Sequence, residues 1–246
     1  MAKLVAVHER SYKGLMPVAS LHRTRLRALL GSLSALSSPP ESWADFGCSN
    51  GFIMQRVLTE LQWSPPTLYG FDHSSRLLQQ AQAKGIPNAN FREFDLNRSH
   101  ETESLFDLVT CFETLEHTGD CRAAFDNLVR HTKPGGRLVV SVPNEIGLIG
   151  LTKFLARPLA RRAPYKNFFN DSNAVAYALA LVAGRRISSF RMPPRKGWAP
   201  HLGFDYRDLL AYVQTNYTAK GQLQPCVIRY VALWTSVLCI WEKPPA

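Results

Sequence analysis

The residues with the clearest chemical potential form the heptapeptide DFGCSNG, from Asp45 to Gly51. It follows a short apolar run and opens onto FIMQRVL, an order that predicts a strand, a tight turn and a helix. Gly47 and Gly51 let the backbone turn sharply and let a ligand approach without meeting a Cβ atom. The following helix offers unpaired N–H groups and the positive end of its dipole. The turn is therefore predicted to hold a nucleotide-like or carboxylate-bearing ligand.

Two familiar motifs match this turn only in part. The dinucleotide fingerprint G-x-G-x-x-G needs a small residue at position 52, where Phe52 would obstruct the pyrophosphate, so a nicotinamide or flavin cofactor is disfavoured. The stretch from Gly47 to Gly51 also matches G-x-S-x-G, the nucleophile elbow of α/β-hydrolases, with Ser49 as nucleophile. That elbow normally follows several strands, whereas this turn follows the first evident strand. A serine hydrolase remains an alternative.

A third motif extends along the chain. The turn resembles D/E-x-G-x-G-x-G, the first motif of class I S-adenosylmethionine-dependent methyltransferases, with Ser49 in place of the middle glycine. Two further apolar runs, TLYGFD and ANFREFDL, end in acids at Asp72 and Asp95. The segments FDLVTCFETLEH at 106–117 and RHTKPGGRLVVSVPNE at 130–145 resemble the family's fourth motif and its helix, turn and fifth strand. The motifs occur in the family's order over residues 43–145.

The resemblance implies S-adenosyl-L-methionine as the cofactor. Asp45 would orient the methionine amino group, and Asp95 with Leu96 would meet the adenine. Asp72 lies about twenty residues beyond the turn, where a doubly wound sheet places an acid against a ribose diol. The predicted cofactor contacts are Asp45, Gly47, Cys48, Ser49, Gly51, Asp72, His73, Asp95, Leu96, Cys111 and Phe112.

Three residues are candidates for the chemical step. Methyl transfer from a sulfonium is an in-line displacement, so positioning in a dry pocket should contribute most, and a hydroxyl acceptor also needs a base. His117 follows the fourth strand, and His201 ends a later insertion above the same sheet edge. Glu116 could serve as the base or bind the acceptor hydroxyl. Equally, His117 could fix a loop through Glu116, His201 could be a lid contact, and the glutamate could be solvated.

The elements that must position these residues alternate between short apolar runs and helical stretches. In a chain of 246 residues with 46% hydrophobic content, this predicts one α/β domain with a mainly parallel sheet. The resemblance adds a doubly wound, seven-stranded sheet of the Rossmann-like methyltransferase type, with an antiparallel pair of strands at its edge. The predicted parts are an N-terminal helical cap at 1–38, a cofactor-binding core at 39–145, a basic insertion at 146–203, and a C-terminal helix and strand pair at 204–246.

The cysteines and the apolar runs bear on location. The five cysteines show no C-x-x-C pairing, and the chain begins without an apolar signal core, so we expect a cytoplasmic protein with no metal site. The uncharged runs at 174–184 and 230–241 are shorter than the ~20 residues of a spanning helix. No membrane-spanning segment is predicted.

Nearly all of the net charge lies in the insertion. Residues 151–200 carry ten basic side chains and one acid, or +9 of the chain's formal +10. On a helical wheel, leucines at 148, 151, 155 and 159 lie opposite Lys153, Arg157 and Arg161, as in a helix lying in a membrane interface. Pro158 is expected to kink or split this helix, because proline removes a hydrogen bond and costs ~3 kcal/mol in a helix interior.

Several partners suit such a segment. It could be a lid with a solvated basic face, or it could touch an anionic membrane or a lipid-linked substrate at the inner membrane face. The ubiquinone-biosynthesis O-methyltransferases are similar in having a membrane-associating insertion after the fifth strand. Nucleic acid is less favoured, because the nearby aromatic residues accompany no recognised RNA-binding motif. The sequence thus predicts an O-methyltransferase for a small-molecule, glycan or lipid-linked acceptor, with the hydrolase and a non-catalytic RNA- or membrane-binding module as alternatives.

Overall fold

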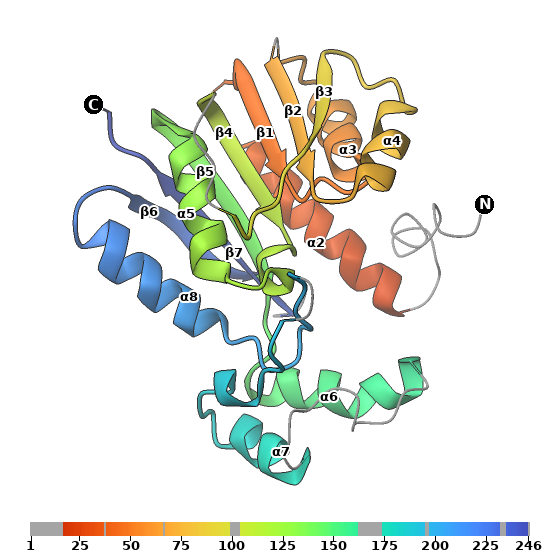
Figure 1. Cartoon of the computed structure of the whole chain (residues 1–246), viewed down its shortest axis with the longest axis vertical. Helices are drawn as coiled ribbons and strands as arrows, with labels where there is room; N and C mark the ends of the chain where they lie inside the picture. The colour runs from red at the N-terminus through yellow and green to blue at the C-terminus, as the bar shows by residue number, and fades with distance from the viewer. Residues whose placement is uncertain are drawn as a thin grey trace.

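The computed structural model describes residues 17–36, 38–65, 67–98, 104–161, 174–194, 197–231 and 235–245. Seven strands form one sheet in the order β3-β2-β1-β4-β5-β7-β6 (Figure 1). They are β1 (Ser42–Phe46), β2 (Thr67–Asp72), β3 (Ala89–Glu93), β4 (Phe106–Phe112), β5 (Thr132–Pro143), β6 (Gln224–Val231) and β7 (Ser236–Glu242).

The helices are α2 (Pro17–Leu33), α3 (Phe52–Leu61), α4 (Ser75–Gln82), α5 (Cys121–His131), α6 (Gly147–Arg161), α7 (Ala174–Val182) and α8 (Tyr206–Val213). Three short helical turns accompany them, η1 (Leu115–His117), η3 (Ser188–Phe190) and η4 (Gln214–Thr218).

The first five strands run parallel, and β7 and β6 are antiparallel additions at one edge. The strand order reverses between β1 and β4, which are neighbours in the sheet. In open α/β sheets, ligands bind at the carboxyl ends of the strands near such a reversal. The predicted doubly wound, mostly parallel sheet of seven strands is confirmed.

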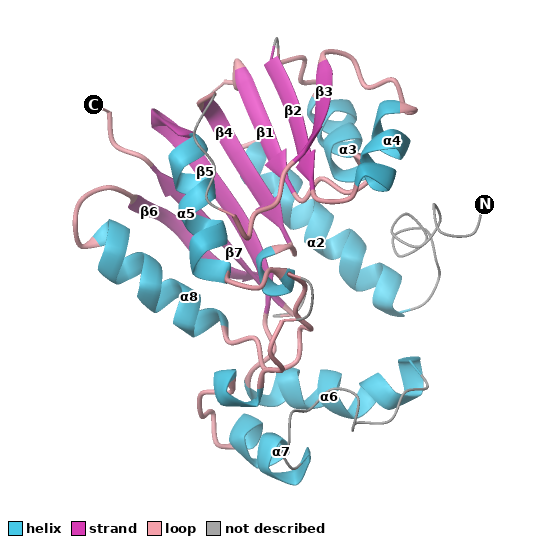
Figure 2. Ribbon diagram, in the orientation of Figure 1, coloured by secondary structure: helices cyan, strands magenta, loops and turns pink. Residues whose placement is uncertain are grey.

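Helices cover both faces of the sheet (Figure 2). One core joins the sheet to α5 and α8, and the other joins it to α2, α3 and α4. Successive side chains of a strand point to opposite faces. Leu138 and Val140 of β5 therefore enter the first core, whereas Val139 enters the second. Burial on both faces explains why the central strands read as nearly continuous apolar runs.

The insertion that follows β5 forms a separate helical layer below the sheet in Figure 1. Helices α6 and α7 pack around a third apolar cluster that includes Phe154, Tyr177 and Leu181. Lys153 of α6 fastens this layer to the sheet, because its ammonium donates to the carbonyls of Asn144 and Thr235, both at 2.8 Å, and pairs with Glu145 at 3.2 Å. The layer is thus held by a buried lysine as well as by apolar packing.

Two expectations about this helix were wrong. Lys153 does not lie on a solvated face but is mostly buried, and burial lowers the pKa of its ammonium, whereas Leu148 and Leu155 are exposed. The helix is also not split in two at Pro158, since one helix runs from Gly147 to Arg161. Pro158 lies in the last turn of α6, so the backbone hydrogen bond that the proline removes is one of the last in the helix.

Parts of the predicted cap and insertion lie outside the described residues, namely 1–16, 37, 162–173 and 195–196. The described part of the cap is α2. Among the described helices, none is long and apolar enough to cross a membrane.

Candidate functional site

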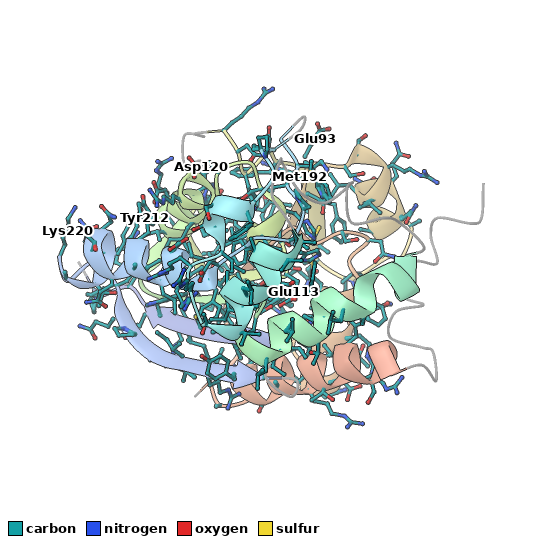
Figure 3. The ribbon with its side chains drawn as sticks, turned by 90° about the horizontal axis from the view of Figure 1, so that it is seen from below. Glu93, Glu113, Asp120, Met192, Tyr212 and Lys220 are labelled. Carbon is teal, nitrogen blue, oxygen red and sulfur yellow. The ribbon has the colours of Figure 1, made fainter. Side chains whose placement is uncertain are left out.

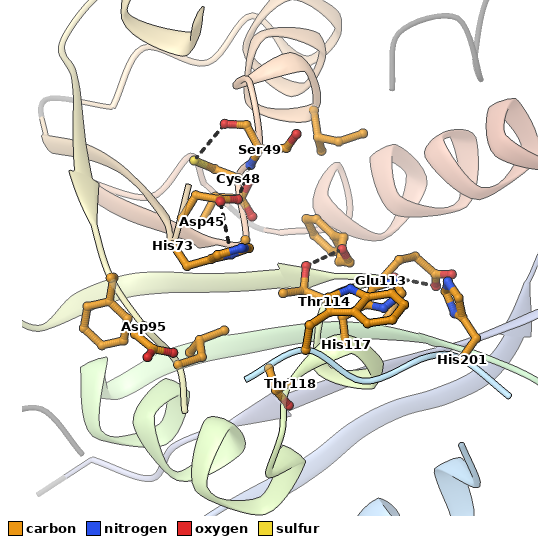
Figure 4. Close-up of a pocket in the computed structure, with 18 of the residues that line it drawn as sticks. Asp45, Cys48, Ser49, His73, Asp95, Glu113, Thr114, His117, Thr118 and His201 are labelled. Carbon is orange, nitrogen blue, oxygen red and sulfur yellow. Dashed lines mark hydrogen bonds and ion pairs between the residues drawn. The ribbon is translucent and has the colours of Figure 1, made fainter. Parts of the chain in front are cut away.

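A cavity of about 630 Å³ opens at the carboxyl ends of the parallel strands (Figure 4). Its walls come from α2, the turn between β1 and α3, the ends of β2, β3 and β4, and the loop before α8. Cavities of this size and placement are typical of small-molecule and cofactor sites. Nine of the predicted cofactor residues line it: Asp45, Gly47, Cys48, Ser49, Asp72, His73, Asp95, Leu96 and Phe112.

The turn after β1 is locked to the end of β2. The N–H groups of Gly47 and Cys48 donate to the carbonyl of Phe71 at 2.7 and 3.0 Å, and the Ser49 N–H donates to Asp72 Oδ2 at 2.9 Å. Gly47 has a φ of +77°, and a Cβ atom there would collide with the Thr114 side chain. The glycine therefore leaves room for the end of β4 to approach the turn.

Two predicted contacts lie away from the cavity. Gly51 is not among the lining residues; a Cβ atom there would lie 3.2 Å from Ile86, so this glycine allows close packing against its neighbours. Cys111 is also not among them, because its side chain points into the apolar core, where burial raises the pKa of the thiol. Both residues therefore pack behind the cavity wall and do not line the cavity.

Asp45 is the most deeply buried acid of the cavity wall, with 2% of the residue exposed. Its Oδ1 atom accepts a hydrogen bond of 2.6 Å from the Thr110 hydroxyl. Burial raises the pKa of the carboxyl to about 7; the Thr110 bond lowers it, and the nearby Asp72 raises it further. A cationic ligand would favour the charged carboxylate.

Two more acids mark the ends of the next strands. Asp72 accepts from the N–H groups of Ser49 and Ser74, each at 2.9 Å, so the carboxylate is fixed toward the cavity. Asp95 accepts from Asn97 at 2.8 and 3.0 Å and lies 3.3 Å from Arg98. Burial opposes its charge, but these hydrogen bonds and the arginine lower the pKa of Asp95. The acids form a row suited to ammonium, hydroxyl and amino donors.

The opposite end of the cavity gathers two histidines and a tryptophan. The rings of His117 and His201 lie 4.1 Å apart, edge to face, and Trp198 stacks on His117 at 5.4 Å. His117 Nδ1 lies 3.0 Å from the Ala199 carbonyl. Because a carbonyl oxygen only accepts, Nδ1 carries the proton, and Nε2 of the neutral ring is then an acceptor.

Glu116 does not line the cavity; it is fully buried, with one oxygen 3.6 Å from His201 Nδ1. Burial and the neighbouring Glu113 raise the pKa of this carboxyl well above its usual range. The structure thus brings the three predicted catalytic residues together, with Glu116 behind the two rings.

The same three residues could also hold a metal ion. Within the described part of the chain they are the one group whose potential ligand atoms all lie within 4.8 Å. One carboxylate and two imidazoles form a donor set that divalent metals accept. The expectation of no metal rested on cysteine spacing alone and stays a prediction.

Other lining residues belong to the helix expected over the cofactor mouth or to the loop after the fourth strand, where Glu113, like Glu116, was a candidate to bind an acceptor hydroxyl or act as the base. Arg25 of α2 pairs with Glu113 at 2.8 Å, and Ser141 donates to the same carboxylate at 3.1 Å. Glu113 adopts a φ of +47°, a strained conformation for a residue other than glycine. Leu26, Leu29, Val231 and Leu238 add an apolar wall that only the packing of α2 against β6 and β7 creates.

The order of the seven strands, five of them parallel, is that of the Rossmann-like class I methyltransferase fold. The family model for a methyltransferase domain matches residues 19–205. The chain therefore belongs to the methyltransferase-domain family, and the predicted S-adenosylmethionine-dependent class and its cofactor are confirmed. This membership removes the support for a serine hydrolase, since Ser49 lies in the family's first motif.

Known proteins similar to this chain are partial matches in sequence. A ubiquinone biosynthesis O-methyltransferase of Paracidovorax citrulli is 30% identical over 105 residues, or 41% of this chain and 42% of that protein. A trans-aconitate 2-methyltransferase of Deinococcus radiodurans is 31% identical over 99 residues, or 40% of this chain and 36% of that protein. The chain thus spans about two-fifths of the curated relatives it matches.

A solved structure extends the likeness over the whole fold. The magnesium protoporphyrin IX methyltransferase of Synechocystis PCC 6803, determined with S-adenosylhomocysteine, superposes with a TM-score of 0.60. The match covers 96% of this chain and 92% of that chain at 16% identity. At this identity the likeness shows the fold alone.

Proposed function

We propose that the protein transfers a methyl group from S-adenosylmethionine to an oxygen of a small-molecule, glycan or lipid-linked acceptor. The observation that carries this proposal is the pairing of His117 and His201 at the end of the cavity opposite the row of acids. An oxygen acceptor loses a proton as the new bond forms, and an imidazole suits that task near neutral pH.

The residues of the cavity suit the cofactor. Gly47 leaves the turn without a Cβ atom, Asp45 and Asp72 offer carboxylates at one end, and Asp95 lies beyond them. Bound there, S-adenosylmethionine supplies an electrophilic methyl group on its sulfonium. The acids would hold the amino group, the ribose diol and the adenine, respectively.

The acceptor end would bind and deprotonate the acceptor. Trp198 and the His117 ring present flat surfaces against which an acceptor can lie. His201, or His117 through Nε2, would take the proton, while the buried Glu116 holds the His201 ring in place. Enclosure by α2 and by the loop before α8 would exclude water from the reacting atoms.

The names of the relatives support an oxygen acceptor without identifying it. One is called a ubiquinone biosynthesis O-methyltransferase, and another a trans-aconitate 2-methyltransferase. Both match this chain over less than half of their length, so neither acceptor is transferred to it.

Methyl transfer from radiolabelled S-adenosylmethionine to a panel of catechols, carboxylic acids and sugars tests the proposal. We expect product with at least one oxygen nucleophile, and a loss of at least a hundredfold in kcat for His201→Gln with S-adenosylhomocysteine affinity unchanged. His131→Gln is the matched control for folding, because His131 is the buried last residue of α5 and is not among the cavity-lining residues. Transfer only to nitrogen or carbon nucleophiles would contradict the proposal.

We also propose that α6 and α7 rest on an anionic lipid surface, as in a cytoplasmic protein at the inner membrane face. Five of the large exposed apolar side chains belong to these helices: Leu148, Leu155, Val175, Leu179 and Val182, each 58–72% exposed. Figure 3 looks onto this helical layer, which forms the lower face of the molecule. The insertion's excess of basic residues favours an anionic surface.

RNA is a weaker candidate for the same region. Arg186 pairs with Asp208 at 2.6 Å, and Arg191 donates to the Glu116 carbonyl at 2.6 Å. With Lys153 also buried, three of the basic residues counted in the sequence serve internal contacts. Among the described side chains of the two helices, most of the exposed ones are instead apolar.

A further inference from the structure

A buried hydrogen-bond chain runs behind the acid that faces the cofactor. The indole Nε1 of Trp43 lies 2.9 Å from the Thr110 hydroxyl oxygen, and that oxygen lies 2.6 Å from Asp45 Oδ1. Trp43 and Asp45 belong to β1, and Thr110 lies beside Asp45 on the neighbouring strand β4. Trp43 and Thr110 are fully buried.

The direction of this chain is fixed by chemistry. An indole N–H can only donate, so Thr110 accepts from Trp43 and has a single proton to give. Two acceptors are near that proton, Asp45 Oδ1 at 2.6 Å and the Ala44 carbonyl at 3.4 Å. The shorter contact takes the proton, so the hydroxyl donates to Asp45. Oδ1 is thereby occupied, and Oδ2 is the oxygen that can meet a ligand.

We propose that Trp43, Thr110 and Asp45 form a hydrogen-bond relay in which Trp43 and Thr110 are positioning residues for the cofactor. They hold Asp45 by Oδ1 and present Oδ2 to the cofactor's ammonium group. Wherever the carboxyl is protonated before binding, it becomes a carboxylate paired with the ammonium and its proton passes to water, so the step balances. The inference rests on the proposed cofactor site.

The surroundings of Asp45 explain why a relay is needed. Its neighbours are Asp72 from the end of β2 and the thiols of Cys48 and Cys111, none of which is cationic. Burial and Asp72 raise the pKa of Asp45 to about 7, and the Thr110 bond is the main influence that lowers it. Without this hydroxyl, a higher pH would be needed before the cofactor finds a carboxylate.

Calorimetric titration with S-adenosylhomocysteine from pH 6 to 9 tests the relay. Two buffers of different ionisation enthalpy report the protons released on binding. We expect the wild-type protein to release close to one proton below pH 7 and progressively fewer above it. Thr110→Val keeps the shape but removes the hydroxyl; it should weaken binding at least tenfold at pH 7 and move the pH profile of Kd to higher pH. Thr110→Ser, which restores the hydroxyl, should bind like the wild type.

Thr132→Val is the matched control. Thr132 is also fully buried, and its hydroxyl donates to a backbone carbonyl, that of Leu128 at 2.9 Å, rather than to an acid of the site. This variant should lower the Tm without moving the pH profile. If Thr110→Val fails to fold, Trp43→Phe takes its place and should move the profile in the same direction by a smaller amount.

The outcomes separate the relay from the cofactor assignment. No binding by the folded wild-type protein would overturn the cofactor site and the relay together. Normal binding by the wild type with an unmoved profile in Thr110→Val would overturn the relay alone. Equal weakening by Thr110→Val and Thr132→Val at every pH would also overturn it, because the loss would then reflect general destabilisation.

Discussion

The two ends of the cavity are built in different ways. At the cofactor end, each of the three acids lies at or just after the end of its own strand. Asp45, Cys48, Ser49 and His73 lie together there (Figure 4). At the acceptor end, contacts join distant segments, as in the bond between His117 and the Ala199 carbonyl, 82 positions apart. The sheet thus positions the three acids, whereas the other end also needs the insertion, which supplies Trp198 and His201 beside His117. If the proposed acceptor site lies there, it can change with the insertion while the row of acids stays the same.

The first prediction concerns the proton that the buried Asp45 carboxyl keeps in the folded protein. The pKa of Asp45 is about 7 in the folded protein and 3.8 for an ordinary aspartate. Between these values the unfolded chain loses the proton while the folded chain keeps it, so this group makes stability fall as pH rises, and the loss levels off above pH 7. Asp45→Asn removes this dependence. Its stability relative to the wild type should therefore rise by about 3 kcal/mol from pH 4 to pH 7 without cofactor.

Urea unfolding of both proteins at several pH values measures this difference. All other titrating groups are common to the two proteins and cancel in the comparison. A difference that does not change with pH would mean that the folded and unfolded chains bind the Asp45 proton equally, so that the carboxyl is ionised over this range and the folded protein keeps no extra proton there.

The second prediction tests the link between the turn and the ribose site. Asp72→Ala removes the acceptor for two backbone N–H groups, those of Ser49 and Ser74, together with the proposed acceptor for the ribose diol. S-adenosylhomocysteine affinity should fall at least tenfold, which corresponds to about 1.4 kcal/mol. Calorimetric titration measures the change.

Asp120→Ala is the control for this effect. Asp120 likewise accepts from two backbone N–H groups, of Arg122 and Ala123, at the start of α5. Its loss should cost about 1 kcal/mol of stability and leave the affinity unchanged. If both variants bind with wild-type affinity, the end of β2 does not hold the ribose.

The contrast between the two ends also decides what the sequence could reveal. Each acid at the cofactor end lies at or just after the end of a recognisable strand. Spacing predicted the place of Asp72, and the resemblance to the family's motifs predicted those of Asp45 and Asp95. Thr110 gave no signal, because one hydroxyl in an apolar strand acquires its role only when β4 pairs with β1. His117 and His201 were predicted to lie above one sheet edge, yet their contact at 4.1 Å depends on how the insertion returns to the sheet.

The errors lie in the insertion for a related reason. A helical wheel separates apolar from charged residues but does not say which face meets the protein. The Lys153 ammonium donates to the carbonyls of Asn144 and Thr235 and pairs with the Glu145 carboxylate, and with the helix in this orientation Leu148 and Leu155 face outward. Hydrogen bonds to a charged group contribute about 1.5–3 kcal/mol each, which offsets the exposure of two leucines.

The smallest expected effect belongs to the outward face of the insertion. If α6 and α7 rest on lipid, replacing Leu155 and Leu179 by serine should weaken sedimentation with phosphatidylglycerol-containing vesicles about fivefold, because less apolar area leaves water. Ile228→Ser is the matched control, since Ile228 is exposed to a similar degree but lies on β6. It should sediment as the wild type does. Affinity for S-adenosylhomocysteine should stay constant in all variants, because none of these residues lines the cavity. Equal loss of vesicle binding in the double variant and in Ile228→Ser would indicate nonspecific hydrophobic binding. Full vesicle binding by the double variant would instead favour the alternative in which the two helices form a lid.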